Sequence, residues 1–130
     1  MFVLNLLNNL IYNALKNSDN EFVKNIENIY TSLPKEPMFP YIFIESGNIK
    51  KCNNYQENIY EVDVSIKIYN KNKSSTDVLN IVDSVQNIVE NIEHNDILDI
   101  NILKISNNFN NSLFPHFEST INVCFLVLES

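Results

Sequence analysis

The feature that most constrains this fold is the stretch Ile59–Glu93, where a strand pattern changes into a helical pattern. In its first part apolar and polar residues alternate one by one, which predicts a strand with one buried face. In its second part apolar residues recur every three or four positions, which predicts an amphipathic helix. The two apolar sets are Tyr60, Val62, Val64, Ile66 and Ile68, and then Val78, Ile81, Val82, Val85, Ile88, Val89 and Ile92. Together they predict a sheet with a helix packed on one face.

The rest of the chain repeats these two patterns. Residues 2–16 carry apolar residues at helical spacing, and residues 41–44 begin a strand that the only glycine, Gly47, breaks as a bulge or a turn. Residues 98–105 read as a strand whose apolar parity changes near Leu103, which indicates a bulge or burial on both faces.

The last strand, residues 121–128, is apolar on both parities toward its end, which is typical of a central strand. A length of 130 residues suits one core. We therefore predict a single domain over residues 1–130. Its fold class is α+β, with a mostly antiparallel four- to five-stranded sheet and two main helices packed on one face.

Three polar segments join these elements. Residues 31–40 hold three prolines, which exclude a helix and indicate a rigid connector or an extended partner-binding segment. Residues 48–58 are rich in Asn and predict a long hairpin tip, and residues 106–116 predict a second polar loop with apolar residues in it. Long surface loops often carry interactions, although they are also often only solvated. The candidate interface residues are Asn48, Lys50, Lys51, Asn53, Asn54, Tyr55, Phe109, Leu113 and Phe114.

The charge of the chain limits the classes of partner. The formal charge is −7 and the nine basic residues are all Lys, so phosphate neutralisation and Arg-based reading of bases are disfavoured. Apolar runs are far shorter than the roughly 18 residues that a membrane span needs, and the basic start of a signal peptide is lacking. We expect a protein made in the cytosol, with no membrane partner.

The sequence offers little for catalysis or metal binding. A single glycine excludes glycine-rich phosphate loops. His94 and His116 lie in predicted turns away from other ligands, and Cys52 and Cys124 are far apart, which favours surface histidines and reduced thiols. Glu61 and Asp63 share the polar face of one strand, where solvated carboxylates are the expected state. We predict no catalytic residues, no metal and no cofactor.

The order of elements and one motif resemble a phage family. The resemblance rests on the segment Ile29-Tyr30 followed by Phe39-Pro40-Tyr41-Ile42-Phe43-Ile44, and then on the polar hairpin, the strand Glu61–Tyr69 and the helix Thr76–Ile92. In these features the chain resembles the tail-completion (tail-terminator) proteins of long-tailed phages and gene transfer agents. The resemblance covers nearly the whole chain. Where the family tends to carry Arg and Gly around the hairpin and a Trp ending the strand, this chain has Lys, Asn and Tyr69.

The resemblance implies a protein that caps the end of a tail tube and joins it to the head–tail connector. It implies a homo-oligomeric ring, usually of six copies, with the tail-tube protein and the connector protein as partners. DNA would pass through the lumen without specific binding, and like charges on the wall would favour sliding. The implied location is the bacterial host cytoplasm during assembly and then the phage-like particle.

Two other classes of function remain open at this level. The chain could be a small adaptor domain that binds one protein through the Pro-rich segment. It could also be an enzyme with a site built from loop carboxylates and a histidine, although the residues favour a non-enzyme. A gene neighbourhood of capsid, connector and tail genes would favour the particle protein.

Overall fold

A computed structural model describes residues 2–53, 57–71, 75–111, 113 and 115–129. The elements, in chain order, are α1 (Phe2–Lys16), β1 (Asn28–Tyr30), β2 (Tyr41–Cys52), β3 (Ile59–Asn70), α2 (Ser75–Glu90), β4 (Ile97–Asn110) and β5 (His116–Leu128). Five strands form one sheet in the order β1-β2-β3-β5-β4. The β1–β2 pair is parallel and the other three pairs are antiparallel. The predicted α+β class is confirmed.

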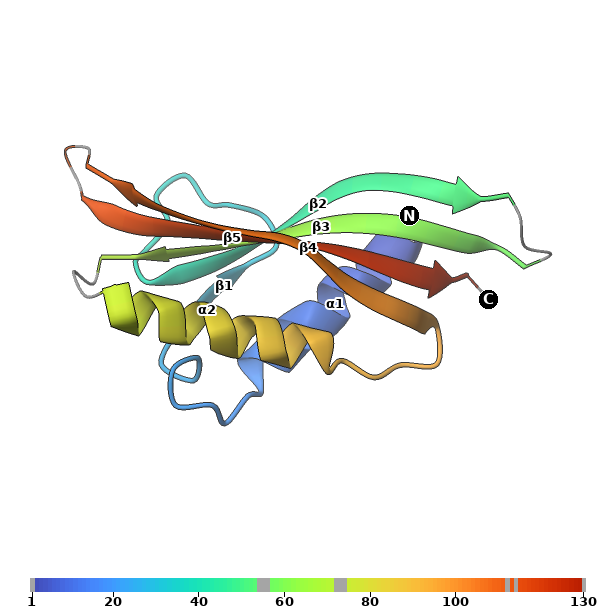
Figure 1. The fold of residues 1–130 in the computed structure, drawn as a ribbon, viewed down its shortest axis with the longest axis horizontal. Helices are drawn as coiled ribbons and strands as arrows, with labels where there is room; N and C mark the ends of the chain where they lie inside the picture. Colours follow the sequence, from blue (N-terminus) through green and yellow to red (C-terminus); the bar gives the residue numbers. More distant parts are fainter. Residues whose placement is uncertain (1, 54–56, 72–74, 112, 114, 130) are drawn as a thin grey trace.

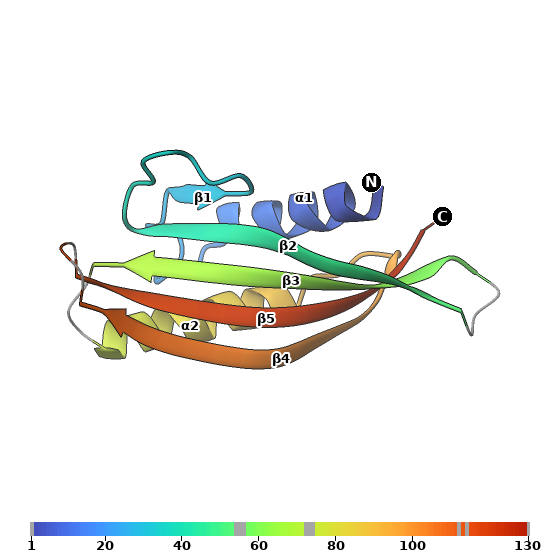
Figure 2. The same ribbon diagram turned by 90° about the horizontal axis from the view of Figure 1, so that it is seen from above.

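Both helices lie on the same face of the sheet (Figure 1). Helix α1 packs against β1 and β2, α2 packs against β4 and β5, and the two helices touch each other. Figure 2 shows the opposite face uncovered, with the four long strands side by side. The molecule therefore has two layers, and one face of its sheet is open.

The alternating apolar residues build the core as the sequence predicts. Each long central strand turns one parity toward the helices, because side chains alternate between the faces of a sheet. The buried set includes Leu7, Ile11, Ile42, Ile44, Val62, Val64, Ile66, Ile68, Val82, Val85, Val89, Ile121, Val123, Phe125 and Val127. Strand β5 is central, as predicted, since it lies between β3 and β4.

The structure corrects the predicted extent of the two hairpins. Asn48, Lys50 and Lys51 were expected in a loop but lie within β2, which continues past Gly47 through a register shift between Ser46 and Ile49. The bulge absorbs the irregularity at the glycine, so pairing with β3 resumes and the strand does not end. The bulge interpretation of Gly47 is confirmed, while a turn at Gly47 is wrong.

The predicted loop 106–116 is also much shorter than expected. Strand β4 extends to Asn110 and β5 begins at His116. Cross-strand contacts hold this polar segment in the sheet: the Phe109 and Phe117 ring centroids are 4.9 Å apart, and Asn110 Nδ2 donates to Glu118 Oε1 at 3.1 Å. A register shift between Ile102 and Lys104 confirms the bulge predicted near Leu103.

Two smaller features of the N-terminal half were not predicted as such. Residues 21–25 form turns between α1 and β1. Ile29 belongs to the short parallel strand β1, which pairs with residues 41–43 of β2. The Pro-rich connector then returns the chain from β1 to β2 and contains a cis peptide bond between Phe39 and Pro40.

Candidate functional site

The candidate interface residues fall into two groups at opposite ends of the sheet (Figure 2). Lys50, Lys51 and Asn53 lie toward the end where Ile59 pairs with Leu128, and Asn48 lies in the bulge of β2, nearer the middle of the sheet. Phe109 and Leu113 lie at the other end, where Asn70 pairs with Phe117. Asn54, Tyr55 and Phe114 are outside the described residues. The structure therefore does not gather the predicted residues into one patch.

The β4–β5 end carries an exposed apolar surface. Leu113 at the hairpin tip is 88% exposed, and Phe109 is half exposed even though its ring contacts Phe117. Lys71, Phe109, Asn111, Pro115 and Phe117 line a cavity of about 440 Å³ at this end. Phe109 thus packs partly onto the sheet, whereas the side chain of Leu113 remains exposed.

An aromatic cluster covers the same end of the open face. Tyr41 stacks on Tyr69 with ring centroids 4.5 Å apart, and Phe39 contacts Tyr41 at 5.3 Å and His116 at 5.1 Å. Tyr30 adds a ring 5.6 Å from Tyr41. Tyr30, Phe39 and Tyr41 belong to the motif that carries the phage-family resemblance, and here they anchor the Pro-rich connector to the sheet.

Electrostatics in this cluster follow from its partial burial. Burial raises the pKa of Tyr41 to about 12, and the nearby Tyr69, Glu118 and Tyr30 act in the same direction. Burial also acts to raise the pKa of Glu118. However, hydrogen bonds from Asn110 and His116, with the charges of His116 and Lys67, bring that pKa below its usual value. His116 Nε2 lies 2.8 Å from Glu118 Oε1. This histidine therefore sits in the packed cluster, not in the surface turn that was predicted.

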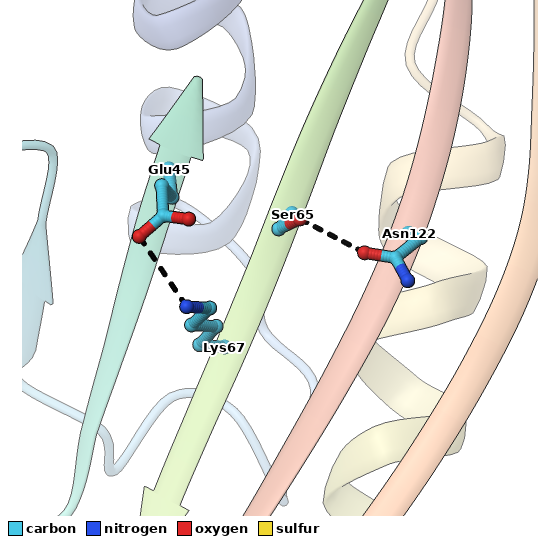
Figure 3. A network of polar contacts seen from close by, with 4 residues as sticks. All are labelled: Glu45, Ser65, Lys67 and Asn122. Atoms are coloured by element: carbon cyan, nitrogen blue, oxygen red, sulfur yellow. Dashed lines mark hydrogen bonds and ion pairs between the residues drawn. The ribbon is translucent and has the colours of Figure 1, made fainter. Parts of the chain in front are cut away.

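The open face of the sheet is polar along its middle. Figure 3 shows Lys67 on β3 paired with Glu45 on β2 at 3.3 Å, and Ser65 Oγ donating to Asn122 Oδ1 on β5 at 2.8 Å. Register places five carboxylates and three lysines of the four long strands on this face: Glu45, Glu61, Asp63, Asp99, Glu118, Lys50, Lys67 and Lys104. Glu61 and Asp63 are thus part of a broad charged surface, as the alternation predicts.

The edge strand β4 exposes several large apolar side chains, unlike the polar middle of the open face. Four of the eight large apolar side chains that are exposed in the described chain lie on the edge strand β4, namely Leu98, Leu103, Ile105 and Phe109. Of these four residues, only Phe109 is among the interface residues predicted from the sequence. The slipped parity of residues 98–105 was the available signal, since an edge strand with bulges cannot bury both of its apolar rows.

Groups with reactive potential are dispersed in the structure. Cys52 and Cys124 are free thiols, and burial, reinforced by the nearby Asp63 and Glu61, raises the pKa of Cys124 to about 11, which disfavours the nucleophilic thiolate. His94 Nδ1 accepts a hydrogen bond from the Asp96 backbone amide at 3.0 Å, within a turn. Among the described residues, His, Cys, Asp and Glu side chains form no group of three or more that would suit a metal ion. In the same residues, each helix is too short or too polar to cross a bilayer.

Comparison with known proteins gives a likeness in structure but none in sequence. No family model matches the sequence, and no curated protein is similar to it in sequence. Among solved structures, the chain is similar to one in the "Virion of native gene transfer agent (GTA) particle", with a TM-score of 0.69 and 9% sequence identity. The match covers 90% of this chain and 91% of that chain. At this identity the likeness establishes a shared fold over nearly the whole length of both.

Proposed function

We propose that this protein is a structural component of a phage-like particle that forms a ring at the end of the tail tube and joins it to the head connector. The observation that carries the proposal is the likeness in fold to a gene transfer agent virion chain over about nine-tenths of each chain. A likeness over the whole length supports a shared architecture better than a match to one motif would. The motif Ile29-Tyr30 with Phe39-Pro40-Tyr41, which suggested tail terminators, lies in the aromatic cluster.

The surfaces of the molecule are consistent with assembly. The β4–β5 end exposes Leu113 and Phe109, and the β2–β3 end exposes Lys50 and Lys51. Exposed apolar patches on small proteins commonly mark contacts with other proteins. In the proposed ring, these two ends would meet neighbouring copies, the tail-tube protein and the connector protein.

The first test is the native mass of the purified protein over a concentration series, followed by negative-stain imaging of large species. We expect a discrete ring, near six copies. A monomer at every concentration, both alone and with the tail-tube protein of the same gene cluster, would contradict the proposal. In the producing cell, loss of the gene should give tails of irregular length or tails without heads.

A second test concerns the β2–β3 tip. Residues Cys52 and Ile59 pair directly, so residues 53–58 can be replaced by a two-residue Asn-Gly turn without changing the strands. We expect the thermal midpoint of the variant to stay within a few degrees of the native value while assembly is lost. An intact ring would remove the tip from the interface and leave Lys50 and Lys51 on the strand as its candidates at this end.

The adaptor hypothesis ranks second. Met38 and Leu33 in the Pro-rich connector are exposed, which leaves side chains available to a partner. However, the segment is tied to the sheet: Asn28 Nδ2 donates to the Met38 carbonyl oxygen at 3.1 Å, and Phe39 packs on Tyr41. Anchoring of this kind favours the connector role. Replacing Met38 and Leu33 by Ser should leave ring formation unchanged under the particle proposal and abolish partner capture under the adaptor one.

A further inference from the structure

Both edges of the sheet offer unpaired backbone over a long distance. Strand β4, 14 residues long, is the outermost strand on one side. On the other side β1 pairs only with residues 41–43, so no described strand covers the outer edge of β2 from Ile44 to Cys52. An uncovered edge is a template for pairing with another chain.

The β4 edge lacks the usual protection against such pairing. Natural edge strands are shortened, charged or twisted away, because an exposed apolar edge promotes association. Strand β4 has bulges, but it is long, and Leu103 and Leu98 are 57% and 48% exposed. An edge that is both long and apolar is more consistent with a strand that is covered in the assembled state.

Residues of opposite charge lie on the two edges at the same level of the strand pairing. Following the pairing across the strands, Lys50 stands opposite Glu61, Glu61 opposite Leu126, and Leu126 opposite Asp99. Two rows further along this face, beyond the row of Asp63, Cys124 and Asn101, Glu45 leads in the same way through Ser65 and Asn122 to Lys104. At the first level the lysine is on β2 and the acid on β4, and at the second level the acid is on β2 and the lysine on β4.

We propose that residues 97–105 of β4 in one copy pair with residues 44–52 of β2 in the next copy, in a head-to-tail contact that places Asp99 beside Lys50 and Lys104 beside Glu45. The proposal rests on the ring proposed above and names the surface that closes it. Three successive antiparallel pairings make β2 and β4 run in opposite directions, so copies related by rotation about an axis along the strands would meet as an antiparallel pair. Such a heterologous contact repeats until the ring closes.

The shape of the open face fits this closure. Residues from β2, β3, β4 and β5, from Gly47 on β2 to Lys104 on β4, line one shallow hollow of about 350 Å³. A hollow lined by both edge strands is consistent with a sheet that curves toward its open face, and bulges such as those in β2 and β4 at this level bend the strands that contain them. The open face would then lie on the inside of the ring.

The decisive experiment is disulfide trapping in a background in which Cys52 and Cys124 are changed to Ser. Opposed positions on neighbouring antiparallel strands have Cβ atoms about 4.5–5.5 Å apart, close enough for a disulfide after small adjustment. Lys50→Cys combined with Asp99→Cys should give, under oxidation, a ladder of covalent oligomers that ends at the ring. Each single variant should give none of these products. The matched control, Lys50→Cys with Asp83→Cys, replaces an exposed acid on α2 and should give no ladder.

Native mass measured on the same samples separates the two proposals. A ring without the trapped ladder overturns the edge pairing and leaves the ring. A monomer without the ladder at every concentration, both alone and with the tail-tube protein, overturns both. Full dimer formation by Asp99→Cys alone would indicate pairing of β4 with β4 and would also overturn the head-to-tail contact.

Charge exchange gives an independent readout. Lys50→Glu or Asp99→Lys places like charges beside each other in every contact of the ring, and each should raise the concentration at half assembly roughly tenfold or more. The double variant restores opposite charges and should recover most of the loss. Additive losses in the double variant would contradict the pairing of these two residues.

Discussion

At the residue scale, Phe125 is the largest completely buried side chain of the described core. It lies on the central strand β5 between Val62 on β3 and Ile100 on β4. Phe125→Ala would remove most of a ring from a site whose neighbours are fixed by strand pairing and would leave a cavity. We expect a loss of about 3–5 kcal/mol in the free energy of unfolding, measured by denaturant titration. Leu113→Ala, at an 88% exposed position, is the control and should change it by less than about 0.5 kcal/mol.

A second residue-scale prediction concerns Tyr41 at high pH. Burial raises its pKa in the folded state to about 12, above the ordinary value of 10.0. The folded state therefore holds the proton more tightly than the unfolded state. This contribution to stability is fully present below pH 10 and is lost as the pH rises toward 12. Ultraviolet titration of phenolate should show a late step that is missing in Tyr41→Phe. An unchanged titration curve in Tyr41→Phe above pH 10 would contradict the prediction.

At the element scale, the bulge of β2 depends on the absence of a side chain at Gly47. A Cβ atom at this position would lie 2.9 Å from the backbone oxygen of Asp63 on β3. A strand backbone cannot move aside as a flexible side chain can. Gly47→Ala should therefore lower the free energy of unfolding by about 1–3 kcal/mol, measured by denaturant titration. Asn48→Ala, at the neighbouring exposed position, should have little effect, and equal effects of the two changes would argue against the close approach as the cause.

How far the sequence predicts these elements depends on periodicity. Where one face is buried, as in β3 and α2, the apolar repeat alone gives the element and its buried side. The ends of β2, β4 and β5 were mistaken for loops because Asn-rich segments have the composition of turns. Their strand structure comes from a partner strand, such as the pairing of Lys50 with Glu61. Tertiary pairing of this kind leaves little trace in a local pattern.

The site was predictable only in part for the same reason. Phe109, Leu113 and Lys50 were identified as exposed interaction candidates, but their separation at two ends of the sheet depends on topology. Lys50 and Asp99 lie at the same level of the sheet, but this is known only once the register of three strand pairs is known. The motif that holds Tyr30, Phe39 and Tyr41 was visible through its resemblance to a phage family, whereas the contact of Phe39 with His116 links positions far apart in the chain.

At the scale of the whole molecule, the charge of the open face would govern how DNA moves through the ring. Each copy has a formal charge of −7, and the face that the edge pairing turns inward carries five carboxylates against three lysines. DNA is repelled by such a wall, so it would slide without adhering. Neutralising Glu61 and Asp63, as Glu61→Gln with Asp63→Asn, would leave three carboxylates against three lysines on this face, so that its excess of negative charge is removed in every copy.

We expect this double variant to assemble normally and to release DNA several-fold more slowly, or to retain DNA, in a delivery assay with intact particles. The matched control neutralises two acids on the outer side of α2, as Asp83→Asn with Glu90→Gln, which changes the net charge equally without changing the open face. Slower release in both variants would assign the effect to net charge. Unchanged release in the β3 variant would mean that the open face does not line the DNA path, because a wall without excess negative charge repels phosphate less and leaves its lysines available to bind it.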